Sequence, residues 1–412
     1  MAKPTIRFKG YTEDWEQRKL GDIYGSIGNA FVGTATPYYA EQGHFYLESN
    51  NVKDGQINHN SEIFINDEFY EKQKDKWLHT GDMVMVQSGH VGHAAVIPEE
   101  LDNTAAHALI MFRNPKEKIE PYFLNYEYQT DKAKKKIENI TTGNTIKHIL
   151  ASDMQEFVVD VPKYKEQKVI AGYFCNIDHL ITLHHRKCEE TKILKKYMLQ
   201  KMFPQDGQKV PEIRFKGYTE EWEQRKFGEI TELKSASRVH KDEWTSNGVP
   251  FYRSSDVMAA INGTENEKAY ISEELYEKLS KVSGKLEEGD ILVTGGGSVG
   301  NPYIVPDNKP LYTKDADLLW IKNKGKFHPY FLYEFFFSPT FRNYLGSISH
   351  VGTIAHYTIT QLSDTPICLP SFEEQKEVGE YFQSLDNLIT LHQRKCEELK
   401  NIKKFMLQNM FV

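Results

Sequence analysis

The chain has 412 residues, of which 39% are hydrophobic and 26% charged, and it includes 23 Phe and 23 Tyr. This composition excludes a largely disordered chain and indicates aromatic-rich, folded domains of a soluble protein. No run approaches the roughly 20 apolar residues of a membrane span, and the N-terminus lacks the apolar segment of a signal peptide, so a cytoplasmic location is expected. The formal net charge is −7, so any binding of phosphate must come from local basic stretches rather than from the whole chain.

The chain contains two copies of one unit of about 207 residues. Residues 6–19, IRFKGYTEDWEQRK, return at 213–226 with 13 of 14 positions identical, and residues 177–203 return at 385–411 with 19 of 27 identical. Between these segments only scattered anchors remain, such as a Gly-Asp pair, a Pro-Tyr-Phe-Leu run and a Glu-Gln-Lys run. A framework that repeats around contents that differ predicts two unlike binding domains held at a fixed separation.

The predicted elements follow the same order in both copies. An N-terminal arm at 1–19 precedes a first domain at 20–165, and a linker with the repeated arm at 204–226 precedes a second domain at 227–372. Short strand-like runs with turn residues between them, and a helix after each Pro-Tyr-Phe-Leu run, indicate an α+β fold with mixed β-sheets. The predicted strands are 82–87, 94–97, 157–161, 290–294, 303–305 and 318–321.

Each copy ends in one long predicted helix, at 166–203 and at 373–412. Apolar residues recur there at spacings of three and four, and no proline interrupts either segment, so each helix runs for roughly 38 residues or about 57 Å. A helix with one apolar stripe needs a partner, and the duplication makes the two helices partners in an antiparallel coiled coil with pseudo-twofold symmetry. The pair then acts as a ruler between the domains. The stripes are Ile170, Phe174, Ile177, Ile181, His184, Cys188, Thr191, Leu194, Met198 and Met202, and Val378, Phe382, Leu385, Ile389, His392, Cys396, Leu399, Ile402, Met406 and Met410.

The midpoint of this pair is expected to gather four residues of metal-ligating type. Each His-x-x-x-Cys sequence places two such side chains on one helix face, which gives a Cys₂His₂ set in composition. The alternative is a polar layer that fixes the register of the helices, and no metal is expected in the chain. The only other cysteines, Cys175 and Cys368, form no C-x-x-C pair, so reduced thiols are expected. The four candidates are His184, Cys188, His392 and Cys396.

Taken together, the repeated segments resemble those of the specificity subunit of type I restriction-modification systems. The match covers nearly the whole chain in the right order, twice. The segments that carry it are the arm RFKGYTEDWEQRKLGDI, the Gly-Asp strands with a small-residue turn at 81–92 and 289–300, the Thr-x-x-His segments at 145–148 and 353–356, the strands that end in Pro162 or Pro370 before Glu-Gln-Lys, and the long helices that carry Arg-Lys-Cys-Glu-Glu and end in Met-Leu-Gln-x-Met-Phe.

The resemblance implies two target-recognition domains that each read one half of a split double-stranded DNA site, with the helices setting the gap. It implies a non-catalytic subunit that docks two methyltransferase (modification) subunits, which two restriction (motor-nuclease) subunits join for cleavage. No cofactor is then expected in this chain, and S-adenosylmethionine, ATP and Mg belong to the partner subunits.

The candidate DNA contacts lie on loops of the divergent regions. The turn after each Gly-Asp strand is suited to close approach to DNA, or it is an ordinary hairpin turn. The Thr-x-x-His segments pair small polar residues with types that contact bases or phosphates, and their alternative use is to cap the next helix. Basic clusters at 132–136 and 184–203 allow phosphate contacts. The candidates are Asn50, Asn51, Ser88, His90, His93, Thr142, Asn144, Lys147, His148, Arg253, Ser255, Ser298, His350, Thr353 and His356.

Other functions have weaker sequence support. Residues 295–300 satisfy the dinucleotide fingerprint G-x-G-x-x-G, but the residues that follow predict a strand and not the helix that the fingerprint must open. Methylation and cleavage are therefore expected from partners. The alternative function is a coiled-coil adaptor that presents two divergent protein- or glycan-binding domains. Trp15, Trp222 and the Met-Leu-Gln-x-Met-Phe ends are expected to serve in packing.

Overall fold

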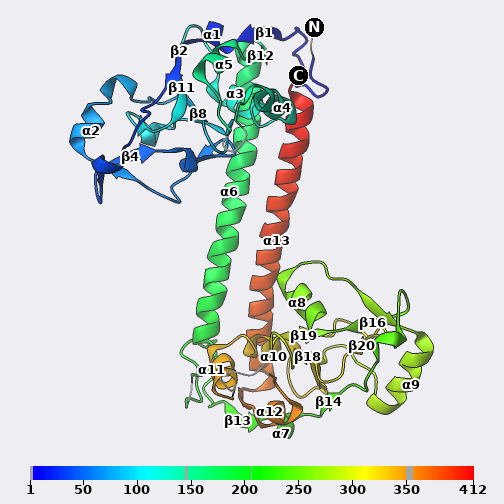
Figure 1. The fold of residues 1–412 in the computed structure, drawn as a ribbon. Helices are drawn as coiled ribbons and strands as arrows, with labels where there is room; N and C mark the ends of the chain where they lie inside the picture. The colour runs from blue at the N-terminus through cyan, green and yellow to red at the C-terminus, as the bar shows by residue number, and fades with distance from the viewer. Residues whose placement is uncertain (1–2, 144–146, 206, 349–355) are drawn as a thin grey trace. The chain divides into compact units, whose positions relative to one another are not determined.

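The protein divides into two compact units that follow the duplication. Each unit is completed by part of a long helix from the other copy of the repeat, because α6 (Tyr164–Lys201) and α13 (Phe372–Met410) each contribute one segment to each unit (Figure 1). Both helices begin and end within two residues of the predicted bounds. Unit 1 comprises Met1–His185 and Arg394–Val412, and unit 2 comprises Arg186–Gln393. The computed structural model describes residues 3–143, 147–205, 207–348 and 356–412.

Unit 1 is a mixed helix and sheet domain. Its central sheet has the antiparallel order β2-β11-β8-β9, a second sheet has the order β10-β4-β7-β3, and β1 pairs with β12. The strands are β1 (Glu16–Lys19), β2 (Tyr24–Asn29), β3 (Tyr39–Ala40), β4 (His44–Leu47), β5 (Val52–Lys53), β6 (Gln56–Ile57), β7 (Phe64–Ile65), β8 (Met83–Val86), β9 (Ala94–Val96), β10 (Ala105–Ala106), β11 (Leu109–Pro115) and β12 (Val158–Val161). The helices before α6 are α1 (Leu20–Ile23), α2 (Asp67–Glu71), α3 (Pro121–Glu127), α4 (Asp131–Ile140) and α5 (Ala151–Glu156).

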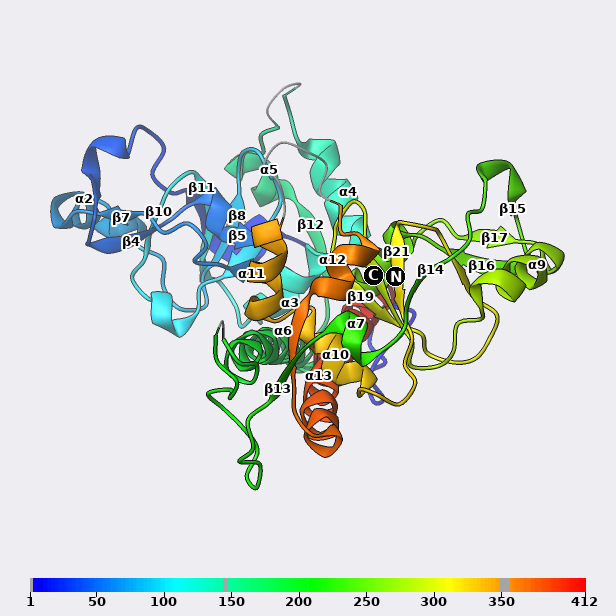
Figure 2. The same ribbon diagram turned by 90° about the horizontal axis from the view of Figure 1, so that it is seen from below.

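Unit 2 repeats this topology although its sequence has diverged. Its sheets have the orders β14-β21-β18-β19 and β15-β17-β16-β20, and β13 pairs with β22. Figures 1 and 2 show the second sheet and α9 beside the first sheet, away from α13. The strands are β13 (Glu223–Lys226), β14 (Leu233–Ser235), β15 (Trp244–Thr245), β16 (Val249–Tyr252), β17 (Ala269–Ile271), β18 (Ile291–Thr294), β19 (Pro302–Ile304), β20 (Tyr312–Thr313), β21 (Leu318–Ile321) and β22 (Pro366–Leu369). The helices before α13 are α7 (Phe227–Ile230), α8 (Ser254–Asn262), α9 (Glu273–Ser283), α10 (Pro329–Phe335), α11 (Pro339–Ile348) and α12 (Ile359–Asp364).

The repeated arm and the Glu-Gln-Lys run meet in an ion pair at the start of each long helix. Arg7 donates Nε and Nη2 to the two carboxylate oxygens of Glu166 at 2.6 and 2.7 Å, and Arg214 binds Glu374 in the same way at 2.6 and 2.8 Å. Both carboxylates are buried. The bidentate geometry fixes the arm against the helix, which explains why two segments so far apart in sequence are retained together in both copies.

The aromatic ends of the long helices pack as expected. In unit 1, Phe411 contacts Trp15 and Phe123, with ring centroids 6.2 and 5.2 Å apart. In unit 2, Phe203 contacts Trp222 at 6.2 Å and Phe331 at 5.3 Å. The tryptophans and the helix ends therefore form the centre of each hydrophobic core.

The two helices run antiparallel within each unit, but their predicted stripe is wrong at one equivalent position. Leu194 and Ile402 are 43% and 46% exposed, and the next residue of each helix turns inward instead. In unit 2, Lys195 lies 2.6 Å from Asp386 and 2.8 Å from Glu334. The buried Glu334 and the partly exposed Asp386 hold the lysine on the inner side of the helix, where it takes the place of the predicted leucine.

In unit 1, Lys403 takes the place of Lys195. Its ammonium group lies 2.7 Å from Asp178 and over the ring of Tyr126, whose hydroxyl donates to the same carboxylate at 2.8 Å.

Among the residues that the structure describes, no helix has the length and apolar content of a membrane span.

Candidate nucleic-acid interface

In unit 1 the turn between β8 and β9 lies against the segment that precedes α5. His148 forms antiparallel bridges with Ser88 and with Thr142, and the Gly89 N–H donates to the Lys147 carbonyl at 3.3 Å. The chain folds this way because β8 is fully buried and ends where the sequence turns to glycine, so the turn emerges at the surface beside the returning segment. The structure thereby brings together Ser88, His90, His93, Thr142, Lys147 and His148.

Unit 2 builds the same backbone frame from different residues. The Tyr357 N–H donates to the Gly295 carbonyl at 2.8 Å, as the Ile149 N–H donates to the Gln87 carbonyl at 3.1 Å in unit 1. The glycines at 295–300 join β18 to β19, so they open a strand and not a dinucleotide-binding helix.

Two candidate side chains of unit 2, Ser298 and His356, lie at this turn. Ser298 is exposed at the tip of the turn. The exposed His356 lies beside Gly296: its Nδ1 would be 3.9 Å from a Cβ atom built on that glycine. Ser298 and Asn301 occupy the positions of His90 and His93 in unit 1. One backbone frame thus presents different hydrogen-bonding groups in the two units.

Burial and a backbone hydrogen bond favour the neutral form of the His93 ring. Burial lowers its pKa, and the Asp54 backbone N–H donates to Nδ1 at 3.2 Å. The proton of the neutral ring therefore resides on Nε2, which is a donor for a base edge or a phosphate.

The structure separates Asn50 from Asn51. Asn50 is exposed, whereas Asn51 is 1% exposed, and its side-chain amide donates to the carbonyls of Asn58 at 3.1 Å and Ser61 at 3.0 Å. Its oxygen accepts the Glu48 N–H at 3.0 Å. Because a buried amide must be satisfied internally, Asn51 organises its loop and is not presented to a ligand. The candidates that lie outside the described residues are Asn144, His350 and Thr353.

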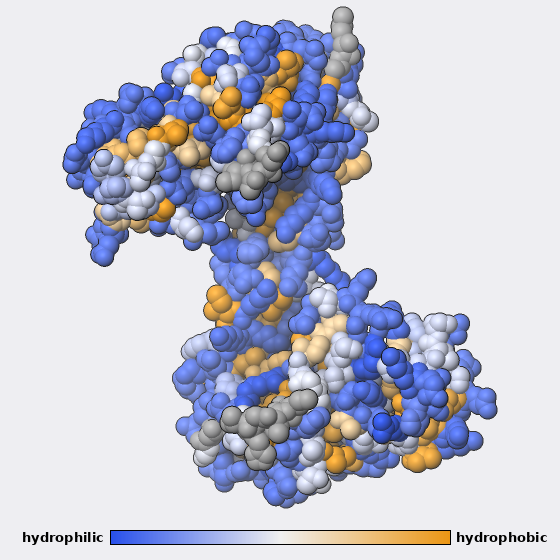
Figure 3. All heavy atoms as spheres, in the orientation of Figure 1, coloured by the Kyte–Doolittle hydropathy of each residue, from blue (hydrophilic) through white to orange (hydrophobic). Residues whose placement is uncertain are grey.

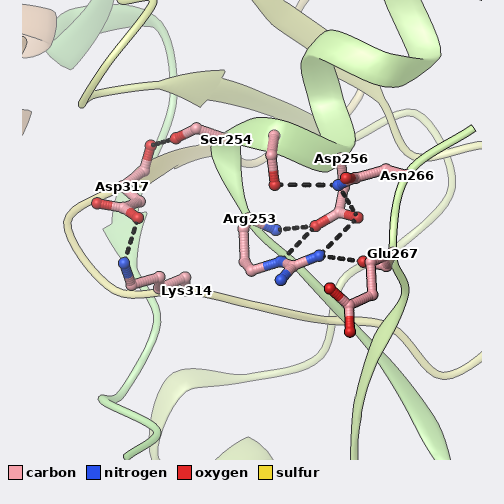
Figure 4. Close-up of polar contacts among 8 residues, drawn as sticks. Arg253, Ser254, Asp256, Asn266, Glu267, Lys314 and Asp317 are labelled. Atoms are coloured by element: carbon pink, nitrogen blue, oxygen red, sulfur yellow. Dashed lines mark hydrogen bonds and ion pairs between the residues drawn. The ribbon is translucent and has the colours of Figure 1, made fainter. Parts of the chain in front are cut away.

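Arg253 is committed to its own helix terminus (Figure 4). Its backbone N–H and its Nε each donate to Asp256 at 2.9 Å, and Nη2 donates to the Glu267 carbonyl. Asn266 donates to the exposed Ser255 hydroxyl at 3.0 Å and to Asp256 at 2.9 Å. The arginine charge is neutralised within this network, so Ser255 is the more accessible of the two candidates.

A cleft of about 550 Å³ opens beside the unit 1 turn. Its walls are the turn at 89–93, α4 and the last turns of α13. The sequence singled out the turn and the α4 cluster but missed the α13 lysines, because they lie some three hundred residues from the turn. The only sequence signal was the lysine-rich end that both long helices share. The charged groups that line the cleft are Lys134, Lys147, Lys400, Lys403, Lys404, Asp54, Asp131 and Glu138.

The cysteines of the long helices lie in the helix seam. Cys188 is buried, with Sγ 3.9 Å from the Ile389 carbonyl in unit 2, and Cys396 is buried, with Sγ 3.5 Å from the Ile181 carbonyl in unit 1. Each thiol can therefore donate to a carbonyl of the facing helix within its own unit. His184 and His392 are half-buried. Within the described residues, no group of three or more His, Cys, Asp or Glu side chains is placed to hold a metal ion.

Comparison with known proteins identifies both halves of the chain. The family model for the type I restriction modification DNA specificity domain matches residues 12–192 and again residues 219–401. The chain is 22% identical over 406 residues to the type I restriction enzyme MjaVIII specificity subunit of Methanocaldococcus jannaschii, which covers 95% of this chain and 91% of the relative.

Two solved structures share the fold. The type I restriction-modification system S subunit from M. genitalium superposes with a TM-score of 0.63 at 15% identity, covering 100% of this chain and 99% of that one. A chain from a structural study of type I R-M complex assembly and conformational transition gives a TM-score of 0.52 at 16% identity, covering 96% and 97%. Because the two matches to the family model together span most of the chain, the chain belongs to the specificity subunits of type I restriction-modification systems, the non-catalytic components that carry the DNA-recognition domains.

Proposed function

We propose that each unit reads one half of a bipartite DNA target through the turn and returning segment described above. The observation that carries this proposal is the backbone frame that the units share while its side chains differ: the position of His90 holds Ser298 in unit 2, and that of His93 holds Asn301. Sequence is read by donors and acceptors on base edges, so two donor sets on one frame suit two unlike half-sites.

Exchange of one recognition domain tests this function. Methylation is mapped genome-wide in cells that express the chain with a methyltransferase subunit of its system, with and without replacement of residues 20–165 by the corresponding domain of another specificity subunit. The expected result is a split motif in which only one half changes. If the assembled complex methylates no defined sequence, the result favours the alternative function, a coiled-coil adaptor that binds protein or glycan.

The long helices set the gap between the half-sites in this proposal. With 38 and 39 residues, α6 and α13 are each about 57 Å long. Deleting one heptad from both shortens them by about 10 Å, which equals roughly three base pairs at about 3.4 Å each. The spacer in the mapped motif should shorten by about the same number of base pairs. An unchanged spacer would refute the proposal that the long helices set the gap.

Exposed apolar residues on the long helices are the proposed docking sites for two methyltransferase subunits. Figure 3 shows apolar atoms at the helix surface. Three equivalent pairs of positions are between 40% and 59% exposed, and large exposed apolar groups mark interaction surfaces. A patch that occurs once per copy suits two identical partners. The pairs are Leu194 with Ile402, Tyr197 with Phe405, and Leu388 with Leu180.

Aspartate substitutions test the docking sites one at a time. Changing Leu194 and Tyr197 to Asp, or Ile402 and Phe405 to Asp, should each reduce the bound methyltransferase subunits from two to one, as measured by light scattering. The control is Ile193→Asp. Ile193 is 69% exposed, but the equivalent position of the other helix holds the polar Asn401, so it is not part of a repeated apolar pair. Unchanged stoichiometry in both variants would place docking elsewhere. The restriction subunits then join through this complex, and S-adenosylmethionine, ATP and Mg are supplied by the partners.

A further inference from the structure

The cleft of unit 1 gathers unpaired positive charge from two distant parts of the chain. Two of its lysines are neutralised: Lys403 by Asp178 at 2.7 Å and Lys147 by Glu138 at 3.0 Å. Over the described ranges, the other three, Lys134, Lys400 and Lys404, have no carboxylate within 4.0 Å. Asp54 and Asp131 also line the cleft but lie farther than 4.0 Å from these three ammonium groups, so the site keeps an excess of positive charge that suits an anion.

In unit 2 the cation equivalent to Lys134 is engaged in contacts within its own unit. Arg342 stands at the position of Lys134, and its guanidinium donates to the Val299 carbonyl at 3.4 Å and to the Asn301 side chain at 3.0 Å. It also lies 5.4 Å from the ring centroid of Phe337, which replaces Gln129 of unit 1. In unit 2 the cation therefore supports the turn itself, whereas in unit 1 the corresponding lysine is left available.

The long helices differ in the same sense. Lys400 and Lys404 are four residues apart on an exposed face of α13, so they project side by side. Their counterparts on α6 are Lys192 and Lys196, of which Lys192 pairs with Glu189 at 2.8 Å. The α6 lysines belong to unit 2, and they offer a matched set of charges outside the unit 1 cleft.

We propose that the cleft binds the DNA backbone, with Lys134, Lys400 and Lys404 on phosphates next to the bases that the unit 1 turn reads. This inference rests on the proposed DNA recognition. The same cleft is lined by His90, His93 and Lys147, so phosphate and base contacts fall at one place. Phosphate contacts fix the register of a protein on the duplex and carry no sequence information, and the end of α13 supplies this positioning.

The salt dependence of DNA binding tests the proposal. The full chain, assembled with its methyltransferase subunits, is titrated with two labelled duplexes of equal length, one with the mapped target and one unrelated. Replacing Lys400 and Lys404 by Ala removes two phosphate contacts, so the slope of log K against log salt should become shallower by about 2 on both duplexes. The affinity should fall on the order of tenfold near 0.15 M salt, and the methylated motif should stay the same.

The control is the double variant Lys192→Ala and Lys196→Ala, which removes the same charge at the equivalent repeat positions. Both pairs flank equivalent apolar positions, so an effect on subunit docking would appear in both variants. The control should keep the wild-type slope. The double variant Lys400→Arg and Lys404→Arg retains both charges, so it should keep the wild-type slope as well. Thermal unfolding confirms that every variant is folded.

An unchanged slope in the Lys400 and Lys404 variant would overturn the proposal, as would an equal fall in the control, which would show an effect of net charge alone. Loss of assembly restricted to this variant would also overturn it and would assign the cleft to an acidic segment of a partner protein. Failure of the proposed function is distinguishable, because the wild type would then show no preference for either duplex.

Discussion

Glu127 is a buried carboxyl group whose protonation should set the pH dependence of unit 1. It ends α3 and is 6% exposed, and one oxygen accepts the Asp160 N–H at 3.4 Å. Within the described residues its other oxygen has no hydrogen-bond partner. The equivalent positions of unit 2 hold Phe335 and Cys368, so an apolar pair fills the same site there. The perturbation is Glu127→Gln, which keeps the shape and removes the charge.

Burial raises the pKa of Glu127 from 4.5 to about 8. Between these values the folded state holds a proton that the unfolded state has lost, so the free energy of unfolding falls as pH rises. At pH 7, about 2.5 pH units above 4.5, the penalty is about 3 kcal/mol at roughly 1.4 kcal/mol per unit. The glutamine variant escapes this penalty. Its stability relative to wild type should be near equal at pH 5 and should rise by roughly 3 to 4 kcal/mol toward pH 8.

Urea unfolding at pH 5, 6, 7 and 8, followed by tryptophan fluorescence, measures this difference. Buried groups remote from Glu127 titrate alike in both proteins, so they cancel in the comparison. The exposed Glu100→Gln serves as the control for the removal of one carboxylate. If the Glu127→Gln difference is flat with pH, the carboxyl is not held protonated in the folded protein, and the reasoning fails.

Three further changes test individual contacts. Arg214→Met leaves the Glu374 carboxylate buried without its partner and should cost about 3 to 5 kcal/mol of unfolding free energy, whereas the double variant with Glu374→Met should recover part of this loss; equal losses in both would deny that the unpaired charge is the cause. Gly300→Ala places a Cβ 2.7 Å from a leucine methyl at a φ of +74°, so a loss of about 1 to 3 kcal/mol is expected in thermal unfolding, and wild-type stability would contradict the strained turn. Asn51→Ala should destabilise the chain by about 1 to 3 kcal/mol because it leaves buried backbone groups unpaired, while the exposed Asn50→Ala should leave stability unchanged; the reverse order would place Asn51 at the surface.

The chain's own duplication made much of the fold predictable. The arm, the Glu-Gln-Lys run and the long helices recur with high identity, and the 3.6-residue period of apolar positions is a local property of a helix that sequence displays directly. The central strands, such as β8 and β18, were predicted because a short run of three or four consecutive apolar residues stands out after a Gly-Asp turn.

The second sheet of each unit was not predicted. Its strands are two to four residues long, and pairs such as β10 with β4 join segments that are distant in sequence. Runs that short carry no detectable alternation, so their pairing is decided by the tertiary fold. The exposure of Leu194 has a similar origin, because only the folded unit reveals that Asp386 and Glu334 draw Lys195 inward.

The sequence by itself determined the duplication, the two long helices, the mixed domains and the family. It also singled out the turn and the Thr-x-x-His segment as candidate contacts, because both recur at one offset. Tertiary structure decided which candidates are accessible: it buries Asn51, commits Arg253 to Asp256 and brings α13 lysines to the unit 1 turn. Burial and ion pairing depend on residues that are remote along the chain, so a local pattern cannot fix them, whereas a helix or a repeat is written in neighbouring residues.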